Sequence, residues 1–97
     1  MSGIVLSRRA ERDLRRIGRG EALARLLEAL EALAVGEATL DVKPLAGSAP
    51  WHRLRVGDYR VLYRVVEPDE AVESEARFLV ARIVHRRDLE RAVVTLE

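Results

Sequence analysis

Arginines in two alternating segments are the residues of this sequence best suited to chemistry. Of the 17 basic residues, only Lys43 is lysine and the other 16 are arginine. Between residues 52 and 86 several arginines stand two or four positions apart among apolar residues, which is the period of a β-strand face. A guanidinium group binds phosphate through parallel hydrogen bonds and stays charged at physiological pH. We therefore predict a phosphate-binding sheet face, called the arginine face, that consists of Arg53, Arg55, Arg60, Arg64, Arg82 and Arg86.

The turn between the first two of these strands sets the pairing of the arginines. Gly57 followed by Asp58 is typical of a two-residue type II′ turn, which places Arg55 directly opposite Arg60. Two like charges in such a pair are destabilising by up to ~1 kcal/mol, and an anionic ligand would relieve that repulsion. The alternative is an ordinary solvated sheet face, filled with arginine because the whole chain is rich in it.

The other face of the same strands is apolar and should carry the helices. In the last strand, alternation puts Leu79, Ala81 and Ile83 in one apolar set. An arginine inside a helix-covered core would be costly without a partner, so we expect Arg82 and Arg86 to join the arginine face. In the preceding hairpin, the predicted core-facing residues are Leu54, Val56, Tyr59, Val61, Tyr63 and Val65.

The order of elements around these strands predicts an α+β fold in one small domain over residues 1–97. We expect an antiparallel β-meander with an N-terminal strand and a two-helix hairpin packed on one face. Ser7 is a candidate N-cap of the first helix, and glycines at 18 and 20 separate it from the second. The expected segments are strands at 4–6, 52–56, 59–65 and 78–84, helices at 8–17 and 21–35, loops at 37–50 and 67–75, and a helical tail at 86–94.

Composition excludes several classes of protein. Of 97 residues, 48% are hydrophobic and 34% charged, which is globular composition, and no apolar run is long enough to cross a membrane. The chain has no cysteine and two histidines, which argues against disulfides and against a zinc site. We therefore expect a cytoplasmic protein with no cofactor, no bound metal and no membrane partner.

Two segments of the sequence resemble the RelE/ParE toxin superfamily. They are KPLAG followed by WHRLRVGDYRVLYR, at residues 43–47 and 51–64, and IVHRRD at residues 83–88. The resemblance implies a toxin of a type II toxin–antitoxin pair, held by a cognate antitoxin in a hetero-oligomer. In that superfamily the RelE branch cuts mRNA in the ribosomal A site, and the ParE branch poisons DNA gyrase.

The RelE-like branch is the favoured interpretation, because the basic positions of that branch map onto arginines here. The resemblance implies that Arg53, Arg55, Arg60 and Arg86 are catalytic. From the residue pattern itself, we expect Arg64, Arg82, Arg87 and Trp51 to contact RNA. Trp51 could instead be a packed core residue. The basic first helix could also meet nucleic acid, although a solvated helix face is the alternative.

The sequence departs from the RelE pattern at the proton-transfer position. Many RelE-like toxins have a tyrosine just after the last strand, and this chain has no tyrosine after Tyr63. We take His85 as the first candidate because imidazole titrates near neutrality, although it could be structural. Glu90, Asp88 and His52 are further candidates. The missing tyrosine keeps two alternatives open: a ParE-type gyrase inhibitor, and a decayed member that only binds its antitoxin.

Overall fold

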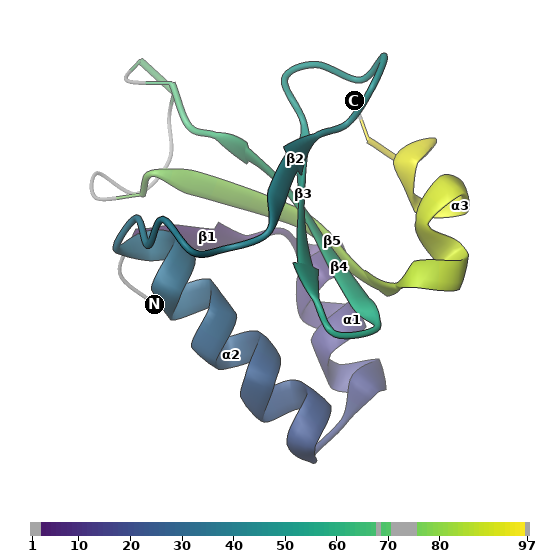
Figure 1. The fold of residues 1–97 in the computed structure, drawn as a ribbon. Coiled ribbons are helices and arrows are strands. Elements are labelled where there is room, and N and C mark those ends of the chain that lie inside the picture. The colour runs from purple at the N-terminus through teal and green to yellow at the C-terminus, as the bar shows by residue number, and fades with distance from the viewer. Residues whose placement is uncertain (1–2, 68, 71–75, 97) are drawn as a thin grey trace.

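The computed structural model describes residues 3–67, 69–70 and 76–96, so the acidic loop predicted over residues 67–75 lies largely outside the described residues. Figure 1 shows a sheet with a helix hairpin on one side and a short C-terminal helix on the other. The elements are β1 (Ile4–Leu6), α1 (Arg8–Ile17), α2 (Glu21–Ala34), β2 (Val42–Pro44), β3 (His52–Val56), β4 (Tyr59–Val65), β5 (Phe78–His85), the 3-10 turn η1 (Arg86–Asp88) and α3 (Leu89–Val93).

The five strands form one mixed sheet in the order β1-β5-β4-β3-β2. Strands β2 to β5 are an antiparallel meander, and β1 pairs parallel to β5. The predicted α+β fold with a meander and a helix hairpin is confirmed. Strand β2 lies inside the segment predicted as loop, because three residues ending in Pro44 carry too little strand signal.

The β3–β4 hairpin has the predicted register. Arg55 pairs with Arg60, and Val56 with Tyr59, across the two-residue turn. Gly57 has a φ of +58°, and no non-glycine residue of the described part has a positive φ. A positive φ at the first turn position alone is the mark of a type II′ turn, which only glycine adopts without strain.

The helix hairpin begins at the predicted cap and covers the predicted face. The Ser7 hydroxyl accepts the backbone N–H of Ala10 at 3.0 Å and donates to the carbonyl of Ala81 at 2.7 Å. The first helix is thereby fixed to β5 as well as capped. Leucines of α2 pack against the sheet, and the largest fully buried side chains of this core are Leu26, Leu30, Leu54, Val61, Val80 and Ile83.

A β-bulge changes the pattern of β5. Leu62 pairs with Arg82, but the next residue, Tyr63, pairs with Val80, so Ala81 is left over. One extra residue reverses the alternation of side chains beyond it. The prediction that Leu79 and Ala81 share the core face with Ile83 is therefore wrong: Val80 and Ile83 are the buried residues of that core.

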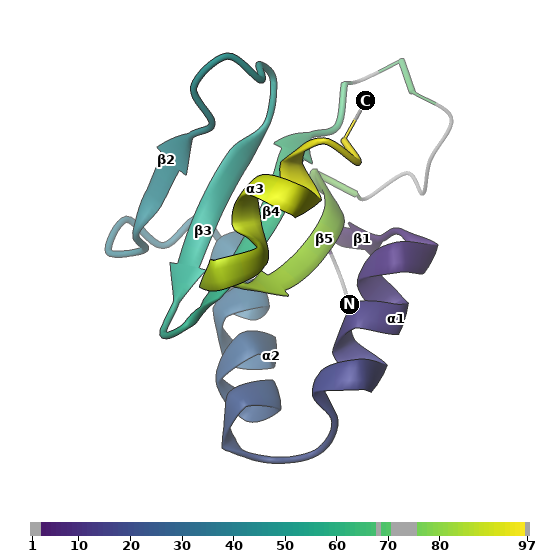
Figure 2. The ribbon, with the colours of Figure 1, turned by 90° about the vertical axis from the view of Figure 1, so that its right-hand side faces the viewer.

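The C-terminal segment covers the middle of the arginine face. Figure 2 shows α3 in front of β4 and β5, on the side away from the helix hairpin. Buried Leu62, Val84 and Ala92 form a second small core there, against which Leu45, Leu89, Val93 and Leu96 pack. The predicted helical tail is present, but the face beneath it is not open along its whole length.

Candidate phosphate-binding site

Four arginines gather at the hairpin end of the arginine face. Arg53 and Arg55 come from β3, Arg60 from β4 and Arg86 from the first residue of η1. Burial is the largest of the effects that lower the pKa of Arg60. The positive charges of Arg55, Arg53 and Arg86 lower it further, in that order. These four residues, called the arginine cluster, are therefore close enough to repel one another.

One carboxylate fixes the β3 side of the cluster. Asp41 accepts from Arg53 Nη1 with Oδ1, and its main-chain carbonyl accepts from the same nitrogen, both at 3.1 Å. Arg53 is only 16% exposed as a result, whereas Arg55, whose Nη1 lies 3.9 Å from Asp41 Oδ2, is 58% exposed. Arg53 is thus a cation held in place by Asp41, and Arg55 is an exposed one.

The turn holds the other two members of the cluster. Arg60 Nη1 donates to the carbonyls of Gly57 and Tyr59, both at 3.0 Å. Arg86 Nε lies 3.5 Å from Asp58 Oδ1, and the Arg86 backbone N–H donates to the Asp58 carbonyl at 2.7 Å. Four cations thus share two carboxylates, which leaves a surplus of positive charge suited to a phosphate diester.

Arg64 and Trp51 lie farther along the sheet. Arg64 forms a two-point ion pair with Glu70, with N···O distances of 2.7 and 2.8 Å. Its guanidinium carbon also lies 5.8 Å from the centre of the Trp51 ring, and Trp51 is buried. Arg64 is four strand positions from Arg60, about 13 Å along β4, so these two predicted RNA contacts stand apart from the cluster.

Arg82 is on the predicted face but is not exposed there. It lies on the arginine face opposite Leu62 but is not an open cation, because it forms an ion pair with Asp13 of α1. Its Nη1 also donates to the Thr95 hydroxyl at 3.2 Å. Sequence reasoning missed Asp13, because a single aspartate in an arginine-rich helix gives no sign of being buried.

His85 lies on the side of Tyr59, away from Arg60. Its ring meets the edge of Tyr59 at 5.7 Å, and its Nδ1 accepts the backbone N–H of Arg87 at 3.2 Å, which caps η1. A neutral imidazole that accepts at Nδ1 carries its proton on Nε2. The strand ends at His85, so this residue and the exposed Arg87 face the space between α1 and α3.

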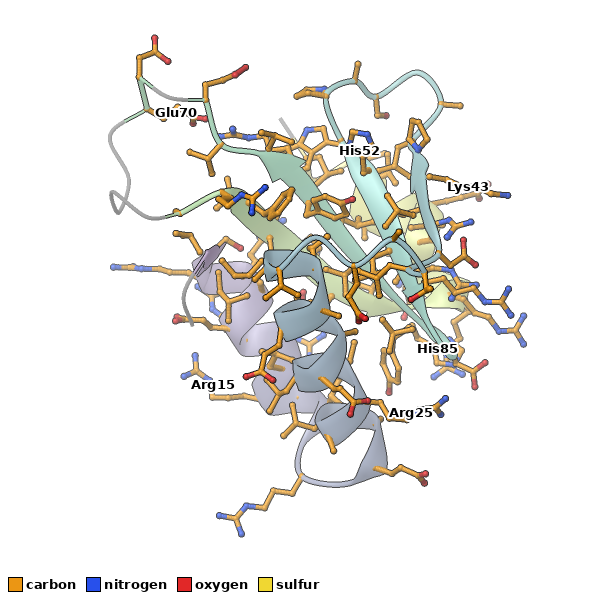
Figure 3. All side chains as sticks on the ribbon, turned by 60° about the vertical axis from the view of Figure 1, so that its left-hand side comes forward. Arg15, Arg25, Lys43, His52, Glu70 and His85 are labelled. Atoms are coloured by element: carbon orange, nitrogen blue, oxygen red, sulfur yellow. The ribbon has the colours of Figure 1, made fainter. Side chains whose placement is uncertain are left out.

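The other proton-transfer candidates occupy different surroundings. His52 stacks on Tyr63 at 5.6 Å, and its buried Nδ1 has no hydrogen-bond partner within the described part of the chain. Figure 3 shows His52 and His85 toward opposite ends of the sheet. Asp88 is half-buried just before α3, and Glu90 is exposed in its first turn. Asp88 and Glu90 therefore share the C-terminal segment with His85.

The described residues offer no cluster of three or more histidine, cysteine or acidic side chains that could hold a metal ion. No helix among them has both the length and the apolar character to cross a membrane.

Known proteins place the chain in a family. Residues 4–90 match the model of the ParE toxin of type II toxin–antitoxin systems. The fold is similar to the RelB–RelE antitoxin–toxin complex of Methanococcus jannaschii, at 22% identity and a TM-score of 0.65 over 91% of this chain and 96% of that chain. It is also similar to the RelE–RelB complex of Pyrococcus horikoshii, at 23% identity and a TM-score of 0.63 over 88% and 94% of the two chains.

A third solved structure is the toxin–antitoxin complex RelBE2 of Mycobacterium tuberculosis, at 25% identity and a TM-score of 0.53 over 88% of this chain and 98% of that chain. No curated protein matches the sequence significantly. The chain belongs to the ParE toxin family, within the RelE/ParE superfamily, and is a toxin of a type II toxin–antitoxin system.

Proposed function

We propose that the chain cuts mRNA in the ribosomal A site, and that a cognate antitoxin restrains it in a hetero-oligomer. The observation that supports this proposal is the arginine cluster. Arg55 stands directly opposite Arg60, an arrangement that costs stability and that a phosphate ligand would relieve. Arg53 and Arg86 add two more cations at the same end of the sheet.

The proposed reaction is attack of a ribose 2′-hydroxyl on the adjacent phosphate. The bond from O2′ to phosphorus forms while the bond from phosphorus to O5′ breaks, which leaves a 2′,3′-cyclic phosphate and a free 5′-hydroxyl. A base takes the 2′ proton, and an acid protonates the leaving oxygen. The phosphate gains negative charge in the transition state, and the fixed guanidinium groups of Arg53 and Arg60 are suited to stabilise it.

Proton transfer is assigned to the C-terminal segment or to the ribosome. His85 can accept a proton at Nε2 only if its neutral ring moves the proton to Nδ1, which breaks the capping bond to Arg87. The carboxylates of Asp88 and Glu90 could accept a proton without that change. The arginines themselves are too basic to carry protons.

A ParE-type gyrase inhibitor is the second candidate function. Two observations favour it: the matching family model is that of the ParE toxin, and no tyrosine follows Tyr63. A gyrase-binding surface does not require a phosphate cradle, so the arginine cluster favours the nuclease. The third candidate is a decayed family member that has lost toxicity and only binds its antitoxin. The experiment below distinguishes the three candidates.

The experiment compares the two activities with one preparation of folded, antitoxin-free protein. In a reconstituted translation system, we expect primer-extension stops at codons in the A site. In a supercoiling assay, we expect no inhibition of gyrase. Gyrase inhibition without mRNA cleavage would replace this proposal with the ParE activity, and neither activity would leave antitoxin binding as the function.

An antitoxin partner is supported by the three similar structures, which are all toxin–antitoxin complexes. The surplus charge of the arginine cluster would attract an acidic segment, and α3 rests on a core of only three buried residues. We expect hydrogen exchange on the complex to show protection over residues 53–60 and 86–93. Protection confined to Leu23–Leu33 of α2 would contradict this surface.

A further inference from the structure

A groove of about 590 Å³ runs between α1 and the segment that follows β5. Figure 2 shows α1 and α3 on either side of the C-terminal half of β5. Residues 82–85 of β5 also line the groove. Its walls carry five exposed arginines, of which α1 contributes three and the C-terminal segment two. These residues are Arg9, Arg12, Arg16, Arg87 and Arg91, and the space between them is called the basic groove.

The arginines of the basic groove form two rows. Arg9, Arg12 and Arg16 follow one another at helical spacing and so share one face of α1, over about 10 Å of its length. Arg87 and Arg91 are four residues apart on the opposite wall. Two facing rows of guanidinium groups suit an extended anion with several charges better than a single small ion.

No carboxylate in the described part of the chain forms an ion pair with these five cations. Within residues 3–67, 69–70 and 76–96, the carboxylates that form ion pairs are Asp13, Asp41, Asp58 and Glu70, and none of their arginine partners is one of these five. Asp13 lines the groove but is already neutralised by Arg82, and Asp88 is the other acidic lining residue. The lining thus holds an excess of four positive charges.

We propose that the basic groove binds the phosphodiester backbone of a nucleic-acid strand. A docking peptide or helix depends on apolar anchor contacts. Of the apolar lining residues, Ile83, Val84 and Ala92 are buried in the two cores, and the partly buried Ile17 and Tyr59 already pack against the first core. Exposed arginine is what the groove offers, and arginine contacts to phosphate supply most of the affinity for a nucleic acid of any sequence.

The basic groove lies beside the arginine cluster. His85 lines the groove, and the next residue, Arg86, belongs to the cluster. One nucleic-acid strand could therefore place a phosphate at the arginine cluster and its neighbouring phosphates in the basic groove. The identity of the strand as mRNA rests on the proposed function, whereas the groove itself rests on its own five arginines.

The test is binding of a labelled single-stranded RNA 20-mer of mixed sequence, measured by fluorescence anisotropy over a range of salt concentrations. The groove variant is Arg12→Gln with Arg16→Gln. The matched control is Arg15→Gln with Arg19→Gln, which removes the same charge at the end of α1 and in the link after it, outside the groove. Arg15 points away from the sheet in Figure 3 and does not line the groove. Circular dichroism is used to check that both variants fold.

We expect the groove variant to bind the RNA at least about tenfold more weakly and to lower the salt slope by about 1.4, the value for two lost phosphate contacts on a single strand. In the control variant, the loss of binding free energy and the change in salt slope should each be less than about a third of those in the groove variant. Equal losses in the two variants would overturn the proposal, because net charge alone would then explain them. Unchanged RNA binding with weaker binding of a poly-glutamate peptide would also overturn it, in favour of an acidic protein partner.

A DNA 20-mer of the same sequence tests whether the groove binds RNA, DNA or both. Equal losses for RNA and DNA support recognition of the backbone, and a loss for DNA alone would identify DNA as the strand. Binding is measured without cleavage, so the result is independent of the proposed nuclease activity. Groove-dependent binding in a protein that fails to cut mRNA would overturn the proposed function and leave the groove intact.

Discussion

Asp13 of α1 binds Arg82 of β5 through both carboxylate oxygens, with Oδ2 at 2.9 Å from Nε and Oδ1 at 3.2 Å from Nη2. The same Oδ2 accepts the backbone N–H of Ile83 at 2.8 Å. The side chains of the pair are 7% and 17% exposed. Strand β1 pairs with β5 only as far as Val80, so beyond that point the edge of β5 has no neighbouring strand. Asp13 accepts the Ile83 backbone N–H on this edge in place of a strand. The ion pair therefore joins the first helix to the sheet.

Asp13→Asn should destabilise the fold by about 3 kcal/mol, because the amide can keep the bond to Ile83 but leaves the charge of Arg82 uncompensated. Urea unfolding measures the loss. Glu11→Gln, on the same helix and exposed, is the matched control and should change stability by less than about 0.5 kcal/mol. The apolar double variant Asp13→Leu with Arg82→Met should be closer to wild type than Asp13→Asn, since a buried pair can be replaced by packed apolar groups. The reverse order would contradict this account.

The hairpin could be predicted residue by residue because local chemistry determines it. Gly57 selects the turn type, and the turn then fixes every pair of β3 and β4. The bulge at Ala81 could not be predicted, since Val80 and Ala81 are both apolar. The alternating pattern is equally consistent with either residue in the core. The pairing of Asp13 with Arg82 is also not a local property, because the two residues are 69 positions apart.

The C-terminal tail and the arginines of α1 both show helical spacing in the sequence. The prediction of the arginine face considered only the alternation along the strands and left this spacing out. Leu89, Ala92, Val93 and Leu96 follow helical spacing, which predicts that the tail packs on something apolar. The sheet residue that it covers is Leu62, the apolar interruption of the arginine face. The arginines of α1 likewise repeat at helical spacing, but the wall that faces them comes from the other end of the chain.

Leu62→Ala should destabilise the protein by about 2–4 kcal/mol, because it empties the middle of the small core beneath α3. Val65→Ala is the matched control on the same strand: Val65 is 52% exposed whereas Leu62 is 0% exposed, and its loss should cost less than about 0.5 kcal/mol. Chemical denaturation gives both values. Similar small costs for both variants would show that α3 does not rest on this face in solution.

Glu70 should stabilise the fold in a defined range of pH. The hydrogen bonds from Arg64, and then from the Glu67 backbone N–H, lower the pKa of Glu70 to about 2. A carboxylate whose pKa is lower in the folded state stabilises that state above the unfolded pKa and loses the effect as pH falls through the folded pKa. The stability difference between wild type and Glu70→Gln should therefore be constant above about pH 5 and shrink between about pH 4.5 and pH 2. A difference that does not change over this range in urea unfolding would count against the ion pair.

Arg60→Gln should reduce mRNA cleavage in the A site by about 10²–10³-fold, the usual effect of removing one group that stabilises transition-state charge. The Gln amide is two bonds shorter than Arg60 Nη1, which donates to the carbonyls of Gly57 and Tyr59, so urea unfolding is measured beside the rate to show that the fold remains intact. Arg15→Gln removes the same charge from an exposed position on α1 and should leave the rate within about twofold. Primer extension at matched protein concentration gives the rates, and equal effects of the two substitutions would mean that only net charge matters.

Arg55→Gln and Arg53→Gln should separate function from stability within the arginine cluster. Both remove a cation beside the proposed phosphate, so both should lower cleavage. Arg55 is 58% exposed and faces Arg60 directly, with Asp41 at 3.9 Å as its one carboxylate contact in the described part of the chain. Its loss should leave the free energy of unfolding unchanged or raise it by up to about 1 kcal/mol, since the cross-strand repulsion disappears.

Arg53 should behave in the opposite way on unfolding. It is 16% exposed and donates to both the carboxylate and the carbonyl of Asp41, which leads into β2. Its loss removes two hydrogen bonds to Asp41, whose carbonyl keeps the bond from the Arg55 backbone N–H, and should lower stability by about 1 kcal/mol. Urea unfolding of the two variants beside the cleavage assay tests both halves of this prediction. If Arg55→Gln destabilises the fold as much as Arg53→Gln, the repulsion between Arg55 and Arg60 is not the cost that a phosphate ligand relieves.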